Sequence, residues 1–279
     1  TKQYYAMKSI KKENLVDKNE IASILVKKQI IQNLKFQFLI GCVACFQTDE
    51  RIYFIMNLIE GESFSEYLLN NKSTEESQIK FFGAIIGLTL EYLHKNGITY
   101  RNINSNDIII QKDGYLKISD IKTNTLFNLK PNLLISKENT IYIPPEELTS
   151  KQYSKDGDWW IYGIILYQLF FGIPPFLNED DKKMKELIER SELRFPKDSK
   201  ASKIAKDLIS KLLNKNPLKR LGHSKDFEDI KNHEFFQGFK FDDVINKKMK
   251  SKYIPKIGNI ITDKEKKIVV SYEELVNSK

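Results

Sequence analysis

The spacing of apolar residues changes at Gly61, and this change constrains the fold more than any other feature of the sequence. Before Gly61, runs rich in β-branched and aromatic residues predict strands, and one segment has apolar residues at helical spacing. The strand-like runs are residues 4–10, 38–46 and 51–59, and the helix-like segment is 20–34. Beyond Gly61 helical spacing dominates, most clearly in residues 77–95, 156–171, 180–191 and 201–213.

This order of elements predicts an α+β fold with two lobes. The small β-rich lobe covers residues 1–59 and the larger helical lobe covers residues 60–239, with a ligand cleft expected between them. A short strand pair, 108–111 and 116–118, is expected within the larger lobe. Residues 240–279 are rich in lysine and weakly periodic, so we expect a C-terminal tail there.

The composition favours a folded chain without nucleic-acid or membrane-spanning character. Its 279 residues include 17 Phe and 13 Tyr, enough to fill a core. The net charge is +8, but lysines alternate with acids, as in residues 178–192, which indicates a solvated surface. No stretch approaches the roughly 20 apolar residues that span a bilayer, and the N-terminal residues lack a signal-peptide pattern. We expect a cytoplasmic location, with attachment to the cytoskeleton or to a larger assembly left open.

Cys42 and Cys45 form an isolated C-x-x-C pair. A structural zinc site needs four ligands, and the sequence has no second cysteine pair. A redox pair should open a helix, whereas residues 40–46 are strand-like, and positions three apart on a strand point to opposite faces. We therefore interpret the pair as two buried or half-buried thiols.

Short motifs follow one another through the larger lobe in a fixed order. They are Tyr100-Arg101-Asn102-Ile103-Asn104-Ser105-Asn106-Asp107, Ser119-Asp120-Ile121-Lys122, Pro144-Pro145-Glu146, Asp156-Gly157-Asp158-Trp159-Trp160, Gly172-Ile173-Pro174-Pro175-Phe176 and Lys219-Arg220-Leu221-Gly222. In order and spacing the series resembles the catalytic loop, metal-binding triplet, A-P-E motif and large-lobe helices of protein kinases. The Tyr-Arg, Asp-Trp-Trp and Arg-Leu-Gly runs resemble the AGC group. Residues 233–239 and 253–256 are similar to cyclic GMP- and cyclic AMP-dependent kinases, and the resemblance covers about residues 1–257.

The resemblance implies a nucleotide site between the lobes. Ala6-Met7-Lys8 matches the V-A-I-K strand, which places Lys8 on the α- and β-phosphates. The given sequence begins at this strand, so the small lobe is expected to lack its first strands here, and the family's glycine-rich loop is not judged from these residues. The expected nucleotide contacts are Ala6, Lys8, Met56, Asn57, Ile59 and Ile109, and the expected Mg²⁺ ligands are Asp107 and Asp120. Binding of ATP and Mg²⁺ is expected to be weak.

Three positions that carry chemistry in the family hold other residues here. Lys27 stands where the family has the glutamate that holds the strand lysine, and two ammonium groups about 4 Å apart repel by about 1 to 4 kcal/mol. Asn102 replaces the catalytic base, and losing a general base typically costs about 10²- to 10⁴-fold in rate. Asn104 replaces the lysine that contacts the transferring phosphate.

The activation segment and the substrate-reading positions also depart from the family pattern. Lys122 replaces the glycine of the metal-binding triplet and removes its backbone freedom. The substrate-adjacent threonine corresponds to Asn139 or Thr140. Where basophilic relatives read substrate arginines with acids, this chain has Asn106 and Gln168.

Four charged residues keep architectural positions: Arg101, Glu146, Asp158 and Arg220. The resemblance implies that Glu146 pairs with Arg220 and that Asp158 braces the backbone of the catalytic loop. Both roles support folding whether or not catalysis occurs.

Three functions are therefore weighed. The first is a pseudokinase that serves as a scaffold or regulatory subunit and binds protein partners through the larger lobe and the tail. The alternative is an active ATP-dependent serine/threonine kinase of the cyclic-nucleotide-dependent type, in which Asp107 or Asp120 takes over base or metal work. The third is a binding protein that does not use nucleotide. The residues at 27, 102 and 104 favour the first over the second.

Overall fold

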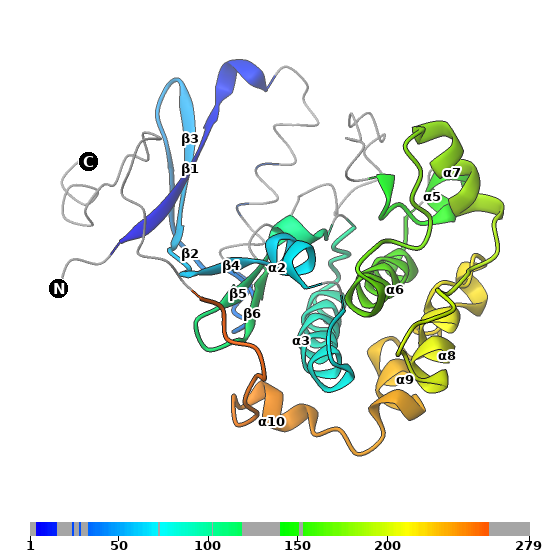
Figure 1. Ribbon diagram of the computed structural model, residues 1–279. Coiled ribbons are helices and arrows are strands. Elements are labelled where there is room, and N and C mark those ends of the chain that lie inside the picture. The colour runs from blue at the N-terminus through cyan, green and yellow to red at the C-terminus, as the bar shows by residue number, and fades with distance from the viewer. Residues whose placement is uncertain are drawn as a thin grey trace.

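The computed structural model describes residues 4–15, 24, 28, 33–71, 73–101, 103–118, 140–150 and 153–256. Within these residues a small β-sheet stands above a larger lobe of helices (Figure 1). The strands are β1 (Tyr5–Lys11), β2 (Cys42–Gln47), β3 (Arg51–Asn57), β4 (Gly61–Ser63), β5 (Ile108–Gln111) and β6 (Leu116–Ile118). The α-helices are α2 (Phe64–Asn70), α3 (Glu76–Lys95), α5 (Pro145–Ser150), α6 (Lys155–Phe171), α7 (Asp181–Arg190), α8 (Lys203–Leu212), α9 (Phe227–Lys231) and α10 (Phe241–Ile245). The 3₁₀ turns are η1 (Lys12–Asn14), η2 (Ser105–Asp107), η3 (Pro217–Lys219) and η4 (Glu234–Phe236). The α+β, two-lobed prediction is confirmed.

The small lobe is built on an antiparallel sheet with the strand order β1-β3-β2. In its register Ala6 lies opposite Met56 and Lys8 lies opposite Phe54. Residues that face each other across an antiparallel pair share one face of the sheet, so these four side chains lie on the same face. Of the helix expected over residues 20–34, the structure describes Ile24, Lys28 and Asn33 in helical conformation.

A bulge in β2 changes the geometry of the cysteine pair. Cys42 lies opposite Met56 and Cys45 opposite Phe54, with the register shifted between Cys42 and Ala44. Because Met56 and Phe54 share a face, both cysteines lie on that face. The opposite-face argument from strand alternation is therefore wrong, whereas half-burial of both thiols is confirmed. Burial raises the pKa of both thiols.

A second sheet, β4-β5-β6, lies where the small lobe meets the helices (Figure 1). The strands β5 and β6 have the bounds expected from the sequence. Ser63 ends β4 and caps α2, since its hydroxyl accepts the Glu66 backbone N–H and the Glu66 carboxylate accepts the Ser63 N–H. The chain therefore passes from the sheet into the helical lobe without a loop.

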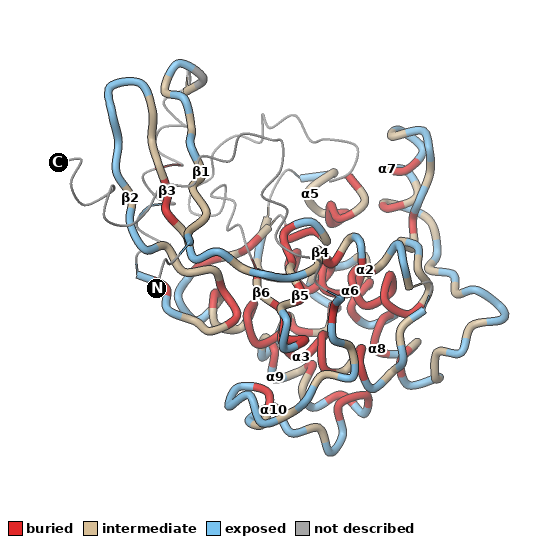
Figure 2. The backbone as a smooth tube through the Cα atoms, turned by 60° about the vertical axis from the view of Figure 1, so that its left-hand side comes forward, coloured by how far each residue is buried: buried red, intermediate tan, exposed pale blue. Residues whose placement is uncertain are grey.

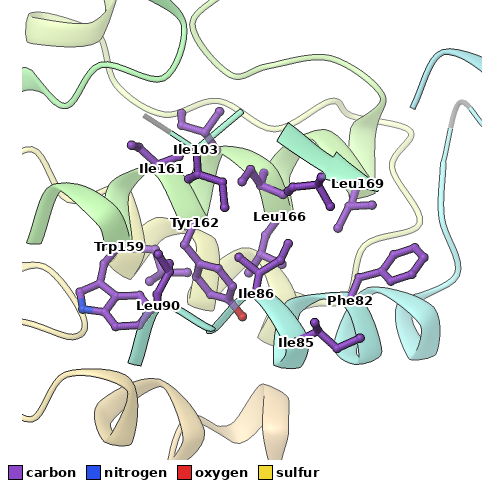
Figure 3. Packing of buried hydrophobic residues seen from close by; sticks show 14 of the residues in the cluster. Phe82, Ile85, Ile86, Leu90, Ile103, Trp159, Ile161, Tyr162, Leu166 and Leu169 are labelled. Carbon is purple, nitrogen blue, oxygen red and sulfur yellow. The ribbon is translucent and has the colours of Figure 1, made fainter. Parts of the chain in front are cut away.

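The core lies between α3 and α6 (Figure 3). Almost the whole of α6 is buried on every side, from Asp156 to Phe170, as expected for a helix at the centre of a lobe. Glycines let α3 approach its neighbours closely: a Cβ atom at Gly83 would lie 2.9 Å from the Tyr162 hydroxyl of α6, and one at Gly87 would collide with the Phe227 ring of α9. Burial is concentrated in this lobe, while the outer strands of the small sheet are mostly exposed or half-buried (Figure 2).

Residues 240–256 pack on the rest of the domain. Val244 of α10 is fully buried, and the Tyr253 ring packs edge-on against Tyr67, with centroids 4.6 Å apart. The Tyr253 hydroxyl donates to Glu62 at 2.5 Å. The structure thus describes the expected tail, residues 240–279, as far as Lys256.

Candidate functional site

One carboxylate of α6 holds the backbone of the segment that matches the catalytic loop. Asp158 is fully buried and accepts the backbone N–H groups of Tyr100 and Arg101, each at 2.7 Å. It also accepts the Tyr153 hydroxyl at 2.5 Å. Charge-assisted bonds of this kind are about twice as strong as neutral ones, so Asp158 fixes where the loop begins.

His94, which the sequence reasoning did not single out, completes this network. Its Nε2 lies 2.8 Å from Asp158 and its Nδ1 lies 2.9 Å from Asp226. Burial alone would lower the pKa of His94, but the hydrogen bonds and charges of the two carboxylates outweigh burial and raise it to about 9. The imidazole is therefore charged at neutral pH and bridges α3, α6 and the start of α9. No spacing rule marks such a histidine in advance, because Asp226 is 132 residues away.

The guanidinium of Arg101 is held by α5. Its Nε donates to the Glu147 carboxylate at 3.0 Å, and its Nη2 bonds the same oxygen. The group also lies over the Tyr153 ring, 5.3 Å from the centroid. Glu147 follows the A-P-E position directly in sequence, but nothing in its spacing predicted this pairing.

The adjacent Glu146 pairs with Arg220, as the resemblance implied. Two guanidinium nitrogens donate to its two oxygens at 2.6 and 2.8 Å. Arg220 also donates to the carbonyls of Asp156 and Asn214 and is only 2% exposed. This geometry ties α5, α6 and the η3 turn together.

Further along the loop, Asn104 turns its side chain back into the protein. Its Oδ1 accepts the Asn106 backbone N–H at 2.9 Å and so caps η2. Asp107 ends that turn, and both side chains are 7% exposed. Carboxylate oxygen is the ligand type that Mg²⁺ prefers, so Asp107 fits the expected metal position by its chemistry.

Of the expected nucleotide contacts, Ala6, Lys8 and Met56 share one face of the small sheet. Asn57 ends β3, and its backbone N–H donates to the Gly41 carbonyl at 3.2 Å. Ile59 lies in the link to β4, where it is half-buried.

The last expected nucleotide contact, Ile109, lies in the second sheet. It is half-buried between the buried Ile108 and Ile110 on β5, and alternation puts it on the opposite face from these two. Across the described residues, no group of three or more His, Cys, Asp or Glu side chains has the geometry of a metal site.

The positions that would read a substrate differ in accessibility. Gln168 is 9% exposed, and its Oε1 accepts the Tyr142 hydroxyl at 3.1 Å. Burial raises the pKa of Tyr142, which keeps this hydroxyl protonated and donating. Thr140 is 1% exposed, whereas Asn106 is exposed.

Several expected site residues lie outside the described part of the chain. They are Lys27, Asn102, Asp120, Lys122 and Asn139. Within the described residues, no helix is long and apolar enough to cross a membrane.

Comparison with known proteins places this geometry in a family. The family model described as protein kinase domain matches residues 1–236. The chain is 34% identical over 270 residues to serine/threonine-protein kinase sgk-1 of Caenorhabditis elegans, covering 93% of this chain and 56% of that protein. It is 32% identical over 268 residues to human RAC-beta serine/threonine-protein kinase, covering 92% of this chain and 53% of that protein. The chain thus spans about half the length of these relatives, which are kinases of the AGC group. This chain belongs to the protein kinase family.

Proposed function

We propose that this kinase domain is a pseudokinase, kept as a scaffold or regulatory subunit. The observation that carries the proposal is Asn104, which stands at the position of the phosphate-contacting lysine and is buried with its oxygen on the Asn106 N–H. An amide cannot supply the positive charge that stabilises a transferring phosphoryl group. Its hydrogen bond serves the loop itself.

The substitution at position 102 supports the same proposal. An amide has no basic lone pair at neutral pH, so Asn102 cannot accept the substrate proton. The loss of a general base alone accounts for about 3 to 5 kcal/mol of barrier. Lys27 adds a like charge where Lys8 needs an anionic partner. Gln168, buried against Tyr142, leaves a substrate arginine without one of its two expected acids.

Weak nucleotide binding is part of the proposal. Lys8 supplies the phosphate-binding cation, and Asp107 with Asp120 supplies carboxylates that hold Mg²⁺. When bound, the metal would neutralise the charge of the phosphates. The Asn57 N–H is already used by Gly41, which removes one backbone donor from the hinge.

Thermal unfolding with ATP, with and without Mg²⁺, tests the binding site. We expect a small stabilisation that depends on Mg²⁺ and is lost in Asp107→Ala and Asp120→Ala. The matched control is Asp198→Ala, an exposed carboxylate on the large lobe, which should leave the shift unchanged. Ligand at 100 times its Kd stabilises by about 2.7 kcal/mol. A full shift of this size that survives both aspartate substitutions would contradict the assignment.

An active serine/threonine kinase is the second candidate. It is favoured by the relatives, all named as such kinases, and by the two aspartates and Lys8 that this chain retains. Asp107 would then act in place of the missing base. Phosphotransfer assays separate the two candidates, whereas nucleotide binding does not.

A protein partner is the reason we propose for keeping the fold. Two adjoining grooves of about 600 Å³ each open beside α9 and α10 on the large lobe. They share Lys231, Phe239 and Phe241 and so offer aromatic surface beside the Lys231–Glu91 ion pair. Residues 257–279 are the second proposed docking element. The similarity of 233–239 and 253–256 to cyclic-nucleotide-dependent kinases supports a regulatory setting of that type.

A further inference from the structure

The short helix α5 carries two consecutive glutamates that hold two different arginines. Glu146 binds Arg220, and Glu147 binds Arg101. The side chains of Glu147 and Arg101 are each 12% exposed, so their charges meet in a largely desolvated setting. In such a setting an arginine whose carboxylate is removed is left as a buried charge, and this is strongly destabilising.

Arg101 is also constrained along its backbone. Its φ angle is +65°, a left-handed conformation that a side-chain-bearing residue adopts at a cost. Asp158 holds its N–H from α6, while Tyr153 lies under its guanidinium. The residue that precedes the catalytic position is therefore fixed at its backbone by α6 and at its side chain by α5.

We infer that Glu147 is a positioning residue: through Arg101 it holds the loop from Tyr100 to Asp107 in the geometry that a Mg²⁺-nucleotide needs. The inference rests on the proposed nucleotide site, since Asp107 is its metal ligand. Glu147 acts by charge and reach, and it touches no ligand itself.

A regulatory consequence follows from the chemistry of the guanidinium. Arginine binds carboxylate and phosphate with the same paired geometry, and a phosphorylated side chain often orders a kinase segment in this way. Here a carboxylate of the same chain already binds the Nε and Nη2 of Arg101. A phosphate that approached this edge of the guanidinium would have to displace it, so this edge is filled without phosphorylation.

Hydrogen exchange on the full chain tests the inference. Glu147→Gln keeps the shape and removes the charge, and we expect faster exchange in residues 98–107 by about 10-fold or more, since a buried pair is broken. Exchange in α8, which lies apart from this contact, should not change. The matched control is Glu228→Gln, which removes an exposed carboxylate paired with Lys231 and should alter neither region.

Anion rescue separates positioning from a merely structural role. In Glu147→Ala, added acetate or inorganic phosphate should slow exchange in residues 98–107, because the small anion takes the vacated place on Arg101. The wild-type chain should not respond. If the alanine variant does not fold, the double variant Arg101→Gln/Glu147→Gln removes both charges, restores folding and should still exchange fast in the loop.

Nucleotide affinity provides the functional arm. Glu147→Gln should weaken binding of a fluorescent ATP analogue about 5- to 10-fold with Mg²⁺, about 1 to 1.4 kcal/mol, and leave binding without Mg²⁺ unchanged. Equal exchange rates in wild type and Glu147→Gln, or a uniform rise that includes α8, would overturn the inference. If the wild-type chain binds no nucleotide, the proposed nucleotide site falls, while the exchange and rescue results still decide the role of Glu147.

Discussion

Single side chains show where the sequence was informative and where it was not. The resemblance implied that Asn104 replaces a phosphate-contacting lysine, but its hydrogen bond to the Asn106 N–H depends on the side-chain rotamer, which the sequence does not give. Arg220 and Glu146 meet as the resemblance implied. The Arg101–Glu147 pair was missed because Glu147 lies just outside the Pro144-Pro145-Glu146 motif, so the resemblance gave it no role.

The charge on His94 gives a prediction at this scale. Its pKa in the folded chain, about 9, lies above the ordinary value of 6.5. A raised pKa stabilises the fold fully below about pH 6.5, and the contribution disappears as pH rises through about 9. The shift corresponds to something on the order of 3 kcal/mol.

Urea unfolding at pH 6.5 and at pH 9.5 measures this contribution. We expect the wild-type free energy of unfolding to decrease from pH 6.5 to pH 9.5. The His94→Gln variant should be less stable than wild type at pH 6.5, and its free energy of unfolding should change less with pH. His223→Gln is the control, since the His223 side chain is more exposed and its imidazole lies beside the Asp156 carboxylate. An equal slope in wild type and His94→Gln would contradict the assigned charge.

At the scale of elements, periodicity located the long helices within one or two residues: 156–171 against α6 at Lys155–Phe171, and 201–213 against α8 at Lys203–Leu212. Helix ends are harder to place: the residue before α3 is Glu75, whose side chain makes no capping hydrogen bond. The bulge in β2 could not be predicted from the sequence, because one extra residue in a strand does not change the residue types that indicate a strand.

The contacts of the described part of the expected tail were not predicted, because they are made with distant partners. Lys252 bonds Glu75 and Gln78, while Tyr253 bonds Glu62. None of these contacts is local, so helical or strand periodicity could not reveal them. Residues 246–256, called the strap below, pack over the turn between β5 and β6.

Substitution of Gly114 tests whether the strap packs against the β5–β6 turn. Its φ is +79°, and a Cβ atom there would collide with the Ser251 side chain and stand 2.5 Å from the Tyr253 carbonyl oxygen. Gly97 has a similar φ of +73° and open space around it. We expect Gly97→Ala to cost about 1 to 2 kcal/mol, from backbone strain alone.

Gly114→Ala should cost about 1 to 3 kcal/mol more than Gly97→Ala, because the strap must also move. Limited proteolysis should cleave residues 246–256 faster in this variant only. Equal stability and equal cleavage in the two variants would mean that the strap does not press on the β5–β6 turn.

At the scale of the whole molecule, the two-lobed architecture and the family were predictable because motif order survives substitution. The architecture depends on buried aromatic residues and on charges such as Asp158 and Arg220, which fold the large lobe without taking part in catalysis. The proposed loss of activity depends on a few positions of the expected site, among them Asn102 and Asn104, which differ from the family pattern. The pseudokinase proposal joins the retained fold to these substitutions.

Transfer of radiolabelled phosphate from ATP to a basic peptide, measured with the purified chain and Mg²⁺, tests this account most directly. Asp120→Ala serves as the blank, because it removes an expected metal ligand. The account predicts that wild type transfers no more phosphate than this blank. Turnover near 1 s⁻¹, about the lower end of the kinase range, that Asp120→Ala abolishes would contradict it.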